Sequence, residues 1–444
     1  MRIIIAGAGE VGTFLAKMLA RENMDITLLE EDAEKMRDLE SSNDLLTQQG
    51  SPTSINDLIE SKVENVDLFI AVTPNESVNM TACMLANNLG AKRTLARIDN
   101  YEYLLPKNKE FFERLGVNHL IYPEVLAANE IVESIRTNWL RQNLSFCNNA
   151  LILLGIKVRA NAVIVNQKFR TKFFDHGKFR VVAINRKNKT IIPKGTDEIQ
   201  ENDIVYFMTT PDNLDFVKTQ AGKEEFQIKN VMIMGGSRIA KKTIQNLPSN
   251  IRVKVLESNR ERSYALADKL SNSLIINCDG RNLEVLKEEG IQDMDAFVAV
   301  TGSSEANILA CLAAKRLGVK KTVAEVENID YIMLAESLDI GTVINKKLIA
   351  ASYIYQLTLD ADVLNVRNLT SADAEVVEFV AKAGSKITRS AIKDIHLPDE
   401  VNIGGIVRNG IGIIVYGNTE VLPNDHVIIF CVSSAIRKIE KYFN

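Results

Sequence analysis

The chain has 444 residues, of which 53 are Lys or Arg and 57 are Asp or Glu, giving a net charge of -4. This balance does not indicate a nucleic-acid-binding surface, which would need an excess of basic residues. No stretch without charged residues reaches the ~18 positions of a membrane span, and the N-terminus lacks a signal-peptide pattern. We therefore expect a cytoplasmic chain with no membrane span of its own and more than one domain, because single cores seldom grow beyond ~250–300 residues.

Strand and helix patterns alternate through residues 1–142. Short apolar runs typical of buried strands are followed by stretches whose apolar residues recur with helical spacing. Because this alternation is typical of a parallel sheet covered on both faces, we predict a Rossmann-like doubly wound domain over 1–142. The predicted strands are Arg2–Ala6, Asp25–Leu29, Asp67–Val72 and Arg93–Ile98, and the predicted helices are Val11–Arg21, Asp32–Leu39 and Asn79–Asn88.

A glycine-rich turn follows the first predicted strand and opens the first predicted helix. Its sequence is Gly7-Ala8-Gly9-Glu10-Val11-Gly12, which matches the G-x-G-x-x-G dinucleotide fingerprint. Gly7 permits the tight turn, Gly9 lets the backbone approach a pyrophosphate, and Gly12 lets the helix pack on the strand. The helix N-terminus favours phosphate charge. The turn is therefore a candidate nucleotide site; the alternative is a glycine-rich turn without a ligand.

An acidic residue, Glu30, follows the second predicted strand, eighteen positions after Gly12. A carboxylate at this place can accept hydrogen bonds from both ribose hydroxyls and would repel a 2′-phosphate. The sequence therefore favours NAD(H) or an adenine nucleotide over NADP(H).

Two further polar residues end predicted strands, at the edge where open α/β sheets bind ligands. Thr73 follows the third strand, and the alternative role for it is to cap the next helix. Arg97 lies at the end of the fourth strand, where it can reach phosphate. The alternative for Arg97 is a structural ion pair.

Residues 143–228 have a different pattern, with short β-rich runs separated by turn signals, and we predict a small α+β domain there. The segment 122–143 before it has long helical spacing, which indicates either a link between domains or subunits or a plain packing helix. The β-rich runs are Ala162–Val165, Val181–Asn185, Thr190–Ile192 and Ile204–Met208.

The pattern then repeats with a period near 228 residues. Ala71-Val72-Thr73 recurs as Ala299-Val300-Thr301, and Asn79 recurs as Asn307. The fold class predicted from this repeat is α/β, with two Rossmann-like doubly wound parallel-sheet domains, each followed by a small α+β domain. The second pair of domains is placed at 229–363 and 364–444.

The second half carries a weaker fingerprint. Ser237 replaces the middle glycine and Ala240 the last one, but both residues are small enough for a close backbone approach. Glu325 takes the place of Arg97, so the two sites do not bind phosphate alike. A structural relic is the alternative reading. The candidate binding residues are Gly235, Gly236, Ser237, Arg238, Ile239, Glu257, Asp279 and Thr301.

Signs of catalysis and of metal binding are missing. None of the four histidines, His119, His176, His396 and His426, follows a predicted strand beside an evident acid partner. The chain lacks the G-x-S-x-G and P-loop motifs. The five cysteines are scattered and form no C-x-x-C, which is typical of reduced packing residues. We therefore predict a protein that is not an enzyme and has no metal site.

These residues and their tandem order resemble the Trk-type potassium uptake regulatory proteins, the TrkA family, over essentially the whole chain. The resemblance implies a homotetramer that binds NAD(H) and ATP or ADP and gates a potassium-transporting membrane subunit. The chain would then lie at the inner face of the membrane through this partner. Carried over by position, Gly7 to Val11, Glu30, Thr73, Pro74 and Arg97 would hold the first ligand, and Gly235 to Ile239, Glu257 and Thr301 the second.

Three alternative functions stay open, and the first two belong to other functional classes. An NAD-dependent oxidoreductase would need a proton donor that the sequence does not offer. A redox-sensing transcription regulator would need a basic recognition helix, and none is evident. The third alternative is a regulator of a different cation channel.

Overall fold

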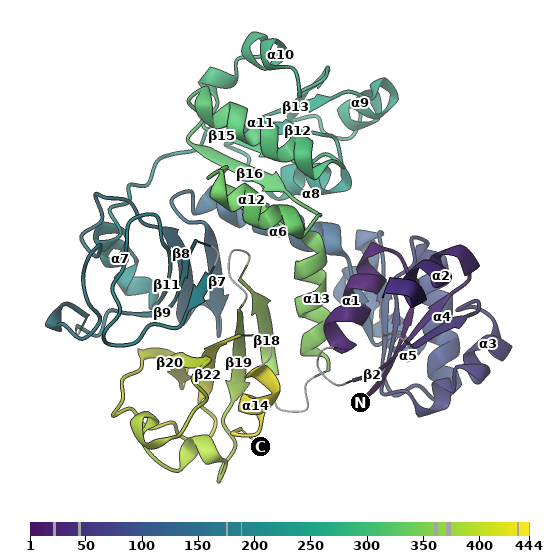
Figure 1. Cartoon of the computed structure of the whole chain (residues 1–444). Coiled ribbons are helices and arrows are strands. Elements are labelled where there is room, and N and C mark those ends of the chain that lie inside the picture. Colours follow the sequence, from purple (N-terminus) through teal and green to yellow (C-terminus); the bar gives the residue numbers. More distant parts are fainter. Residues whose placement is uncertain are drawn as a thin grey trace. The chain divides into compact units, whose positions relative to one another are not determined.

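A computed structural model describes residues 1–20, 24–42, 46–174, 176–187, 189–358, 363–369, 374–432 and 435–443 (Figure 1). The end of the predicted helix at Arg21 lies outside these residues. The chain forms two compact units, one of residues 1–126 with 347–358 and the other of residues 127–346 with the segment from 359 onward. The boundary between the two units falls within one helix, α6 (Pro123–Arg136).

The first unit contains a parallel six-stranded sheet of order β3-β2-β1-β4-β5-β6. Its inner strands consist mainly of buried apolar residues, as expected of a sheet covered on both faces. The order reverses between β1 and β4, which leaves a crevice at the carboxyl ends of the strands. The strands are β1 (Arg2–Ala6), β2 (Asp25–Glu30), β3 (Leu46–Gln49), β4 (Leu68–Ala71), β5 (Thr94–Arg97) and β6 (His119–Ile121); the helices are α1 (Glu10–Ala20), α2 (Ala33–Ser42), α3 (Ile55–Glu60), α4 (Glu76–Asn88) and α5 (Pro106–Arg114).

The second unit contains a sheet of the same design, with order β14-β13-β12-β15-β16-β17. Its strands are β12 (Asn230–Met234), β13 (Arg252–Glu257), β14 (Ser273–Asn277), β15 (Ala296–Ala299), β16 (Lys321–Glu325) and β17 (Thr342–Ile344). Its helices are α8 (Arg238–Asn246), α9 (Arg260–Ala267), α10 (Leu283–Glu288), α11 (Ser304–Arg316) and α12 (Asp330–Ser337). The following helix, α13 (Lys346–Gln356), belongs to the first unit from Lys347 onward. The predicted domain boundaries stay predictions.

Two antiparallel sheets complete the second unit, and they too share one topology, β10-β9-β11-β8-β7 and β21-β20-β22-β19-β18. The same ion pair braces a hairpin in each: Arg186 with Asp203 and Arg408 with Asp425. The elements are β7 (Gln142–Phe146), β8 (Leu151–Lys157), β9 (Phe179–Arg186), β10 (Lys189–Ile191), β11 (Ile204–Thr209), α7 (Leu214–Gln220), β18 (Val363–Asn368), β19 (Glu375–Val380), β20 (Val401–Arg408), β21 (Ile411–Ile414), β22 (His426–Cys431) and α14 (Ile436–Glu440). The predicted fold class is confirmed.

The two small sheets pack on one another through a shared apolar core. Leu153 and Tyr206 of the first sheet meet Val376, Ile428 and Phe430 of the second in this core. The opposite face of the first sheet is also buried, around Leu154 and Phe207. Burial on both faces explains why β8 is a continuous apolar run instead of an alternating one.

Three local predictions differ from the structure. Ala162–Val165 is a turn instead of a strand, with Ile164 buried in the core of the small domain. The long helix expected over 122–143 ends at Arg136, because residues from Gln142 onward pair with β8 as strand β7. The strands β7 and β8 themselves were not predicted.

Among the described residues, no helix is both long and apolar enough to cross a membrane.

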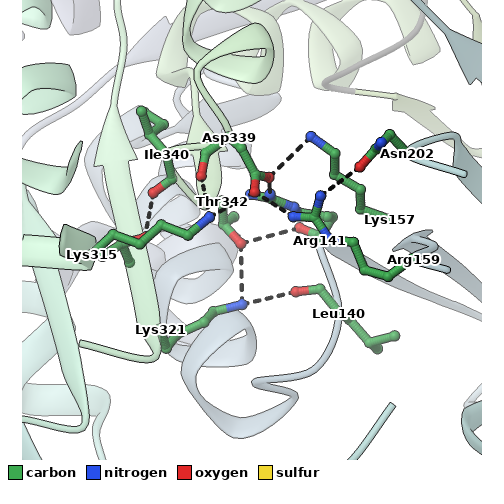
Figure 2. A network of polar contacts seen from close by, with 11 residues as sticks. Leu140, Arg141, Lys157, Arg159, Asn202, Lys315, Lys321, Asp339, Ile340 and Thr342 are labelled. Atoms are coloured by element: carbon green, nitrogen blue, oxygen red, sulfur yellow. Dashed lines mark hydrogen bonds and ion pairs between the residues drawn. The ribbon is translucent and has the colours of Figure 1, made fainter. Parts of the chain in front are cut away.

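Asp339 joins the first small sheet to the second parallel-sheet domain, as Figure 2 shows. Its carboxylate accepts hydrogen bonds from Lys157 at 3.0 Å and Lys315 at 2.7 Å, and also from Arg141 and Arg159. Burial by itself would raise the pKa of Asp339, but Arg141, Lys315 and Lys157 outweigh it and hold that pKa far below its ordinary value. One carboxylate thus compensates four cations at this junction.

The substitution Asp339→Asn should lower the free energy of unfolding of the second unit by roughly 2–4 kcal/mol, because it leaves the cations uncompensated. A carboxylate with a lowered pKa stabilises above its unfolded pKa and loses that effect as pH falls through the folded value. The difference between variant and wild type should therefore be full at pH 7 and shrink below about pH 4. Denaturant unfolding across this pH range measures it.

Asp399→Asn is the matched control, since the Asp399 side chain is 90% exposed and lies 3.5 Å from Lys194. An exposed pair of this kind contributes little, so no measurable change is expected. Equal effects of the two substitutions would contradict the role assigned to Asp339.

Candidate functional site

In the glycine turn of the first crevice, a side chain would clash at Gly7 and Gly12 but not at Gly9. A Cβ on Gly12 would lie 1.9 Å from the Gly7 carbonyl oxygen, so α1 can approach β1 only with glycine there. Gly7 has a φ of 105°, and a Cβ on it would lie 3.0 Å from the Thr73 nitrogen. By contrast, no atom lies within 4 Å of a Cβ on Gly9. The space beside Gly9, at the N-terminus of α1, is therefore accessible to a ligand.

Glu30 is joined to this turn by direct hydrogen bonds. Its Oε2 accepts from the Ala8 amide at 2.7 Å, and its Oε1 accepts from the amides of Glu31 and Asp32 at 3.1 and 3.2 Å. A carboxylate has about four acceptor positions, so these bonds leave capacity for a ribose hydroxyl. The carboxylate fixes the turn at the end of β2 and stays available at the crevice.

Asn79 organises the opposite side of the crevice. Its Oδ1 accepts from the Thr73 amide at 2.9 Å and the Thr73 hydroxyl at 2.7 Å, while its Nδ2 donates to the carbonyls of Thr73 and Arg97. Pro74 follows directly in the same loop. In the sequence, Asn79 is distinguished only because it recurs as Asn307. The side chain holds two strand ends together, which is a reason for the repeat.

Arg97 and Glu10 both have ionic partners in the first unit. Arg97 lies 3.1 Å from Glu124, whose side chain is 9% exposed, so the ion pair weighed as the alternative for Arg97 is present. Contact of Arg97 with a phosphate stays a prediction. Glu10, the first residue of α1, lies 2.9 Å from Lys347 of α13 and directs its carboxylate to that lysine. Val11 follows it as the second residue of α1.

The second crevice holds a pocket of about 310 Å³ at the carboxyl ends of β12, β13 and β15. Six of the eight candidates predicted for this half line it. Arg238 is not among the lining residues, and Ile239 is 2% exposed in the core, so the Ile239 side chain does not face a ligand. The six lining residues are Gly235, Gly236, Ser237, Glu257, Asp279 and Thr301.

The turn of the second crevice is built like the first. Glu257 is 4% exposed, and its Oε2 accepts from the Gly236 amide at 2.7 Å. A Cβ on Gly236 would lie 2.8 Å from the same oxygen, so glycine is needed there. Ser237 caps α8 by accepting from the Ala240 amide. Asn307 binds Thr301 as Asn79 binds Thr73.

Two arginines distinguish the second pocket. Arg281 pairs with Asp279, with its Nη2 2.7 Å from the carboxylate, and the hydrogen bonds from Arg281 lower the pKa of Asp279. Arg262 lies 3.8 Å from Glu257. Both arginines line the pocket, and the sequence prediction missed them. Their position shortly after β13 and β14 was the available signal.

The two crevices differ in charge at the end of the fifth strand of each parallel sheet, β5 and β16. Glu325 stands where the first half has Arg97, and it is 3% exposed. Burial raises the pKa of Glu325 to about 7, while Lys346, 3.6 Å away, opposes that rise. The second crevice therefore places its positive charge on Arg262 and Arg281 and not on this strand.

Paired parallel-sheet and small antiparallel domains, with a dinucleotide-type crevice in each parallel sheet, define a tandem Rossmann-like protein. The chain belongs to the TrkA family. The TrkA-N domain matches residues 3–123 and 231–346, and the TrkA-C domain matches residues 153–220 and 376–444. The resemblance found in the sequence is confirmed.

Relatives and solved structures agree with this assignment. The chain is 33% identical to the Trk system potassium uptake protein TrkA of Haemophilus influenzae, over 100% of this chain and 98% of the relative. It is 32% identical to the protein of the same name from Halomonas elongata, with the same coverage. These relatives are uptake proteins and not enzymes, as the sequence analysis expected.

Similar structures include the GsuK RCK domain, with a TM-score of 0.61 and 13% identity over 100% of this chain and 94% of that one. The GsuK channel bound to NAD has a TM-score of 0.61 and 14% identity over 100% and 78% of the two chains. At this identity the likeness concerns the fold alone.

Gly12→Ala should destabilise the first unit by about 2 kcal/mol, because the added methyl overlaps the Gly7 carbonyl and α1 must move. Gly9→Ala should change the stability by less than ~0.5 kcal/mol, since its methyl meets no atom. Denaturant unfolding of both variants measures the difference. A Gly9→Ala variant as unstable as Gly12→Ala would show that the turn is not open at Gly9.

Proposed function

We propose that this chain is the regulatory subunit of a Trk-type potassium uptake system and binds NAD(H) and adenine nucleotides. It would act in the cytoplasm as a homotetramer, at the inner face of the membrane through a potassium-transporting partner. The observation that carries the nucleotide part is the grouping of a glycine turn, a strand-end carboxylate and a strand-end threonine in each crevice. The full-length likeness to potassium uptake proteins supports the transport part.

The first crevice fits a dinucleotide such as NAD(H). The open space beside Gly9 admits a pyrophosphate to the amides at the start of α1. Glu30 accepts from the ribose and disfavours a 2′-phosphate by charge repulsion. Gly7, Ala8, Glu10 and Val11 would offer backbone groups, while Thr73, Pro74 and Arg97 would border the ligand on the far side of the crevice. The GsuK channel, which has the same fold, has a structure with NAD bound.

The second crevice fits an adenine nucleotide with more phosphate charge, ATP or ADP, as well as NAD(H). Arg262 and Arg281 supply cations at the pocket wall, and guanidinium groups bind phosphate oxygens well. Glu257 would accept from the ribose, as proposed for Glu30. Gly235, Gly236, Ser237 and Thr301 would border the phosphates, with Arg238 at the start of the helix. Asp279 would reach the adenosine only by sharing its bonds with Arg281.

Gating would follow from unequal affinity of each nucleotide for two states of the assembly. A ligand that binds both states equally shifts nothing, and a full switch needs a preference of about 10⁴-fold. Helix α6, within which the boundary between the two compact units falls, is the element we propose to transmit the change.

Calorimetric titration of NADH, NAD, ATP and ADP tests both sites with a matched pair of variants. Gly9 and Gly302 lie in the two crevices, and a Cβ on either meets no atom within 4 Å, so aspartate fits without steric strain. Its charge should weaken binding of a phosphate at least tenfold. Each of Gly9→Asp and Gly302→Asp should lose a different binding event and keep the thermal stability of the wild type.

Unchanged binding in Gly9→Asp would remove the assignment of the first site, and unchanged binding in Gly302→Asp that of the second. NADPH serves as a further control. It should bind at least tenfold more weakly than NADH, and equal affinities would contradict the role of Glu30.

The transport part is tested with vesicles that hold the membrane partner. Added wild-type protein should make potassium flux depend on nucleotide, because the ligand shifts the assembly between states. The Gly9→Asp/Gly302→Asp double variant should bind the partner and give flux that nucleotides do not change. A response in the double variant equal to the wild type would separate gating from both crevices.

A further inference from the structure

Three metal-ligating side chains meet where the two small sheets pack together. The Cys147 thiol donates to Oε1 of Glu378 at 3.0 Å, and Nδ1 of His426 lies 2.9 Å from the same oxygen. The three ligand atoms all lie within 4.8 Å of one another. Cys147 and Glu378 are 231 positions apart in the sequence, and Glu378 and His426 are 48 apart. Spacing along the chain gave no sign of this group, so the sequence predicted no metal site.

The fold places each ligand independently. Cys147 stands at the end of β7, in the turn to β8 that the bond from the Ala150 amide to the Cys147 carbonyl closes. Glu378 of β19 pairs with Ile428 of β22, two positions from His426, so the two polar side chains share one face of the second sheet. Cys147 packs against the apolar core between the sheets, which brings its sulfur to that face.

The repeat shows that the fold does not need these residues. In the first small sheet, Gly155 pairs with Tyr206 as Glu378 pairs with Ile428 in the second, and Ile204 takes the place of His426. The same topology thus forms with a glycine and an isoleucine at the equivalent positions. The carboxylate and the imidazole are therefore additions specific to the second small domain.

The charge at this place also favours a cation. Glu378 is 1% exposed, and a buried carboxylate is costly unless positive charge or hydrogen bonds compensate it. The Cys147 thiol donates its proton to this carboxylate at 3.0 Å. A divalent cation would replace that proton and turn the repulsion between thiolate and carboxylate into attraction to the ion.

We propose that Cys147, Glu378 and His426 bind a Zn²⁺ ion through Sγ, Oε1 and Nδ1, with water as the fourth ligand. Sulfur, nitrogen and oxygen at bond lengths of about 2.0–2.3 Å form a tetrahedral zinc site in which neighbouring ligand atoms are about 3.3–3.8 Å apart. The observed group reaches this spacing with small side-chain shifts. Binding releases one proton from the thiol as the Zn–S bond forms. The ion would tie the first small domain to the second.

The ligand set also selects the metal. Thiolate and imidazole prefer zinc and related transition metals, whereas Mg²⁺ and Ca²⁺ prefer oxygen ligands in larger number. This proposal does not depend on nucleotide binding, because none of the three residues belongs to either crevice.

Metal titration of the full-length chain, free of any affinity tag and stripped with a chelator, tests the proposal. Zn²⁺ should bind at one equivalent per chain with proton release, and Co²⁺ should give the absorption band of a thiolate ligand. Cys147→Ser and His426→Ala should weaken Zn²⁺ binding more than tenfold, since even the loss of an outer-shell contact costs 10–100-fold. Mg²⁺ and Ca²⁺ at the same concentration should give no such binding.

Cys278→Ser is the matched control, because Cys278 is a partly exposed free cysteine outside the group. It should keep full binding and the cobalt band. Zn²⁺ should also raise the thermal midpoint of wild type and Cys278→Ser but not that of Cys147→Ser. Absence of a thiolate band in the wild type would overturn the proposal. So would equal zinc binding by the wild type, Cys147→Ser and His426→Ala, and the three side chains would then form a hydrogen-bonded group only.

Discussion

A hydrogen bond from a backbone amide to a carboxylate at the end of a strand sets the shape of both crevices. Glu30 holds the amide of Ala8, and Glu257 holds the amide of Gly236, each at 2.7 Å. The bond joins the end of the second strand of each unit to the turn after the first, so it fixes the loop that opens the helix. Because the carboxylates accept without using every lone pair, the same group can position the loop and meet a ribose.

Duplication kept the fold and changed the charges placed on it. The two parallel sheets share one strand order, and the two antiparallel sheets share another. Asn79 and Asn307 make the same hydrogen bonds at corresponding strand ends. Yet Glu325 takes the place of Arg97, and the second pocket gains its cations from Arg262 of α9 and from Arg281 in the turn after β14. Each of these strand-end residues has an ionic partner of its own, Glu124 for Arg97 and Lys346 for Glu325. Two crevices of different charge thus share one scaffold.

The small domains contribute many contacts between residues that lie far apart in the sequence. Their sheets bury a common apolar core, and Asp339 connects the first of them to the second parallel-sheet domain through Arg141, Lys157 and Arg159. Which side chains of a strand are buried depends on what packs against each face of its sheet. The sequence of a single strand does not show this. Ala162–Val165 is an example: Ala162 and Ile164 are buried in the core from a turn, although the run has the sequence pattern of a strand.

By itself the sequence determined the local and periodic features: the alternation of strands and helices, the repeat, the glycine turn and the acid that follows the second strand. These depend on residues close together in the chain or separated by a constant offset. Only the tertiary structure decided which distant side chains meet. It paired Arg97 with Glu124, brought Arg281 into the second pocket, and collected Cys147, Glu378 and His426 at one point. The physical reason is that sheet packing and register, which set those distances, depend on the whole buried surface and not on the spacing of any motif.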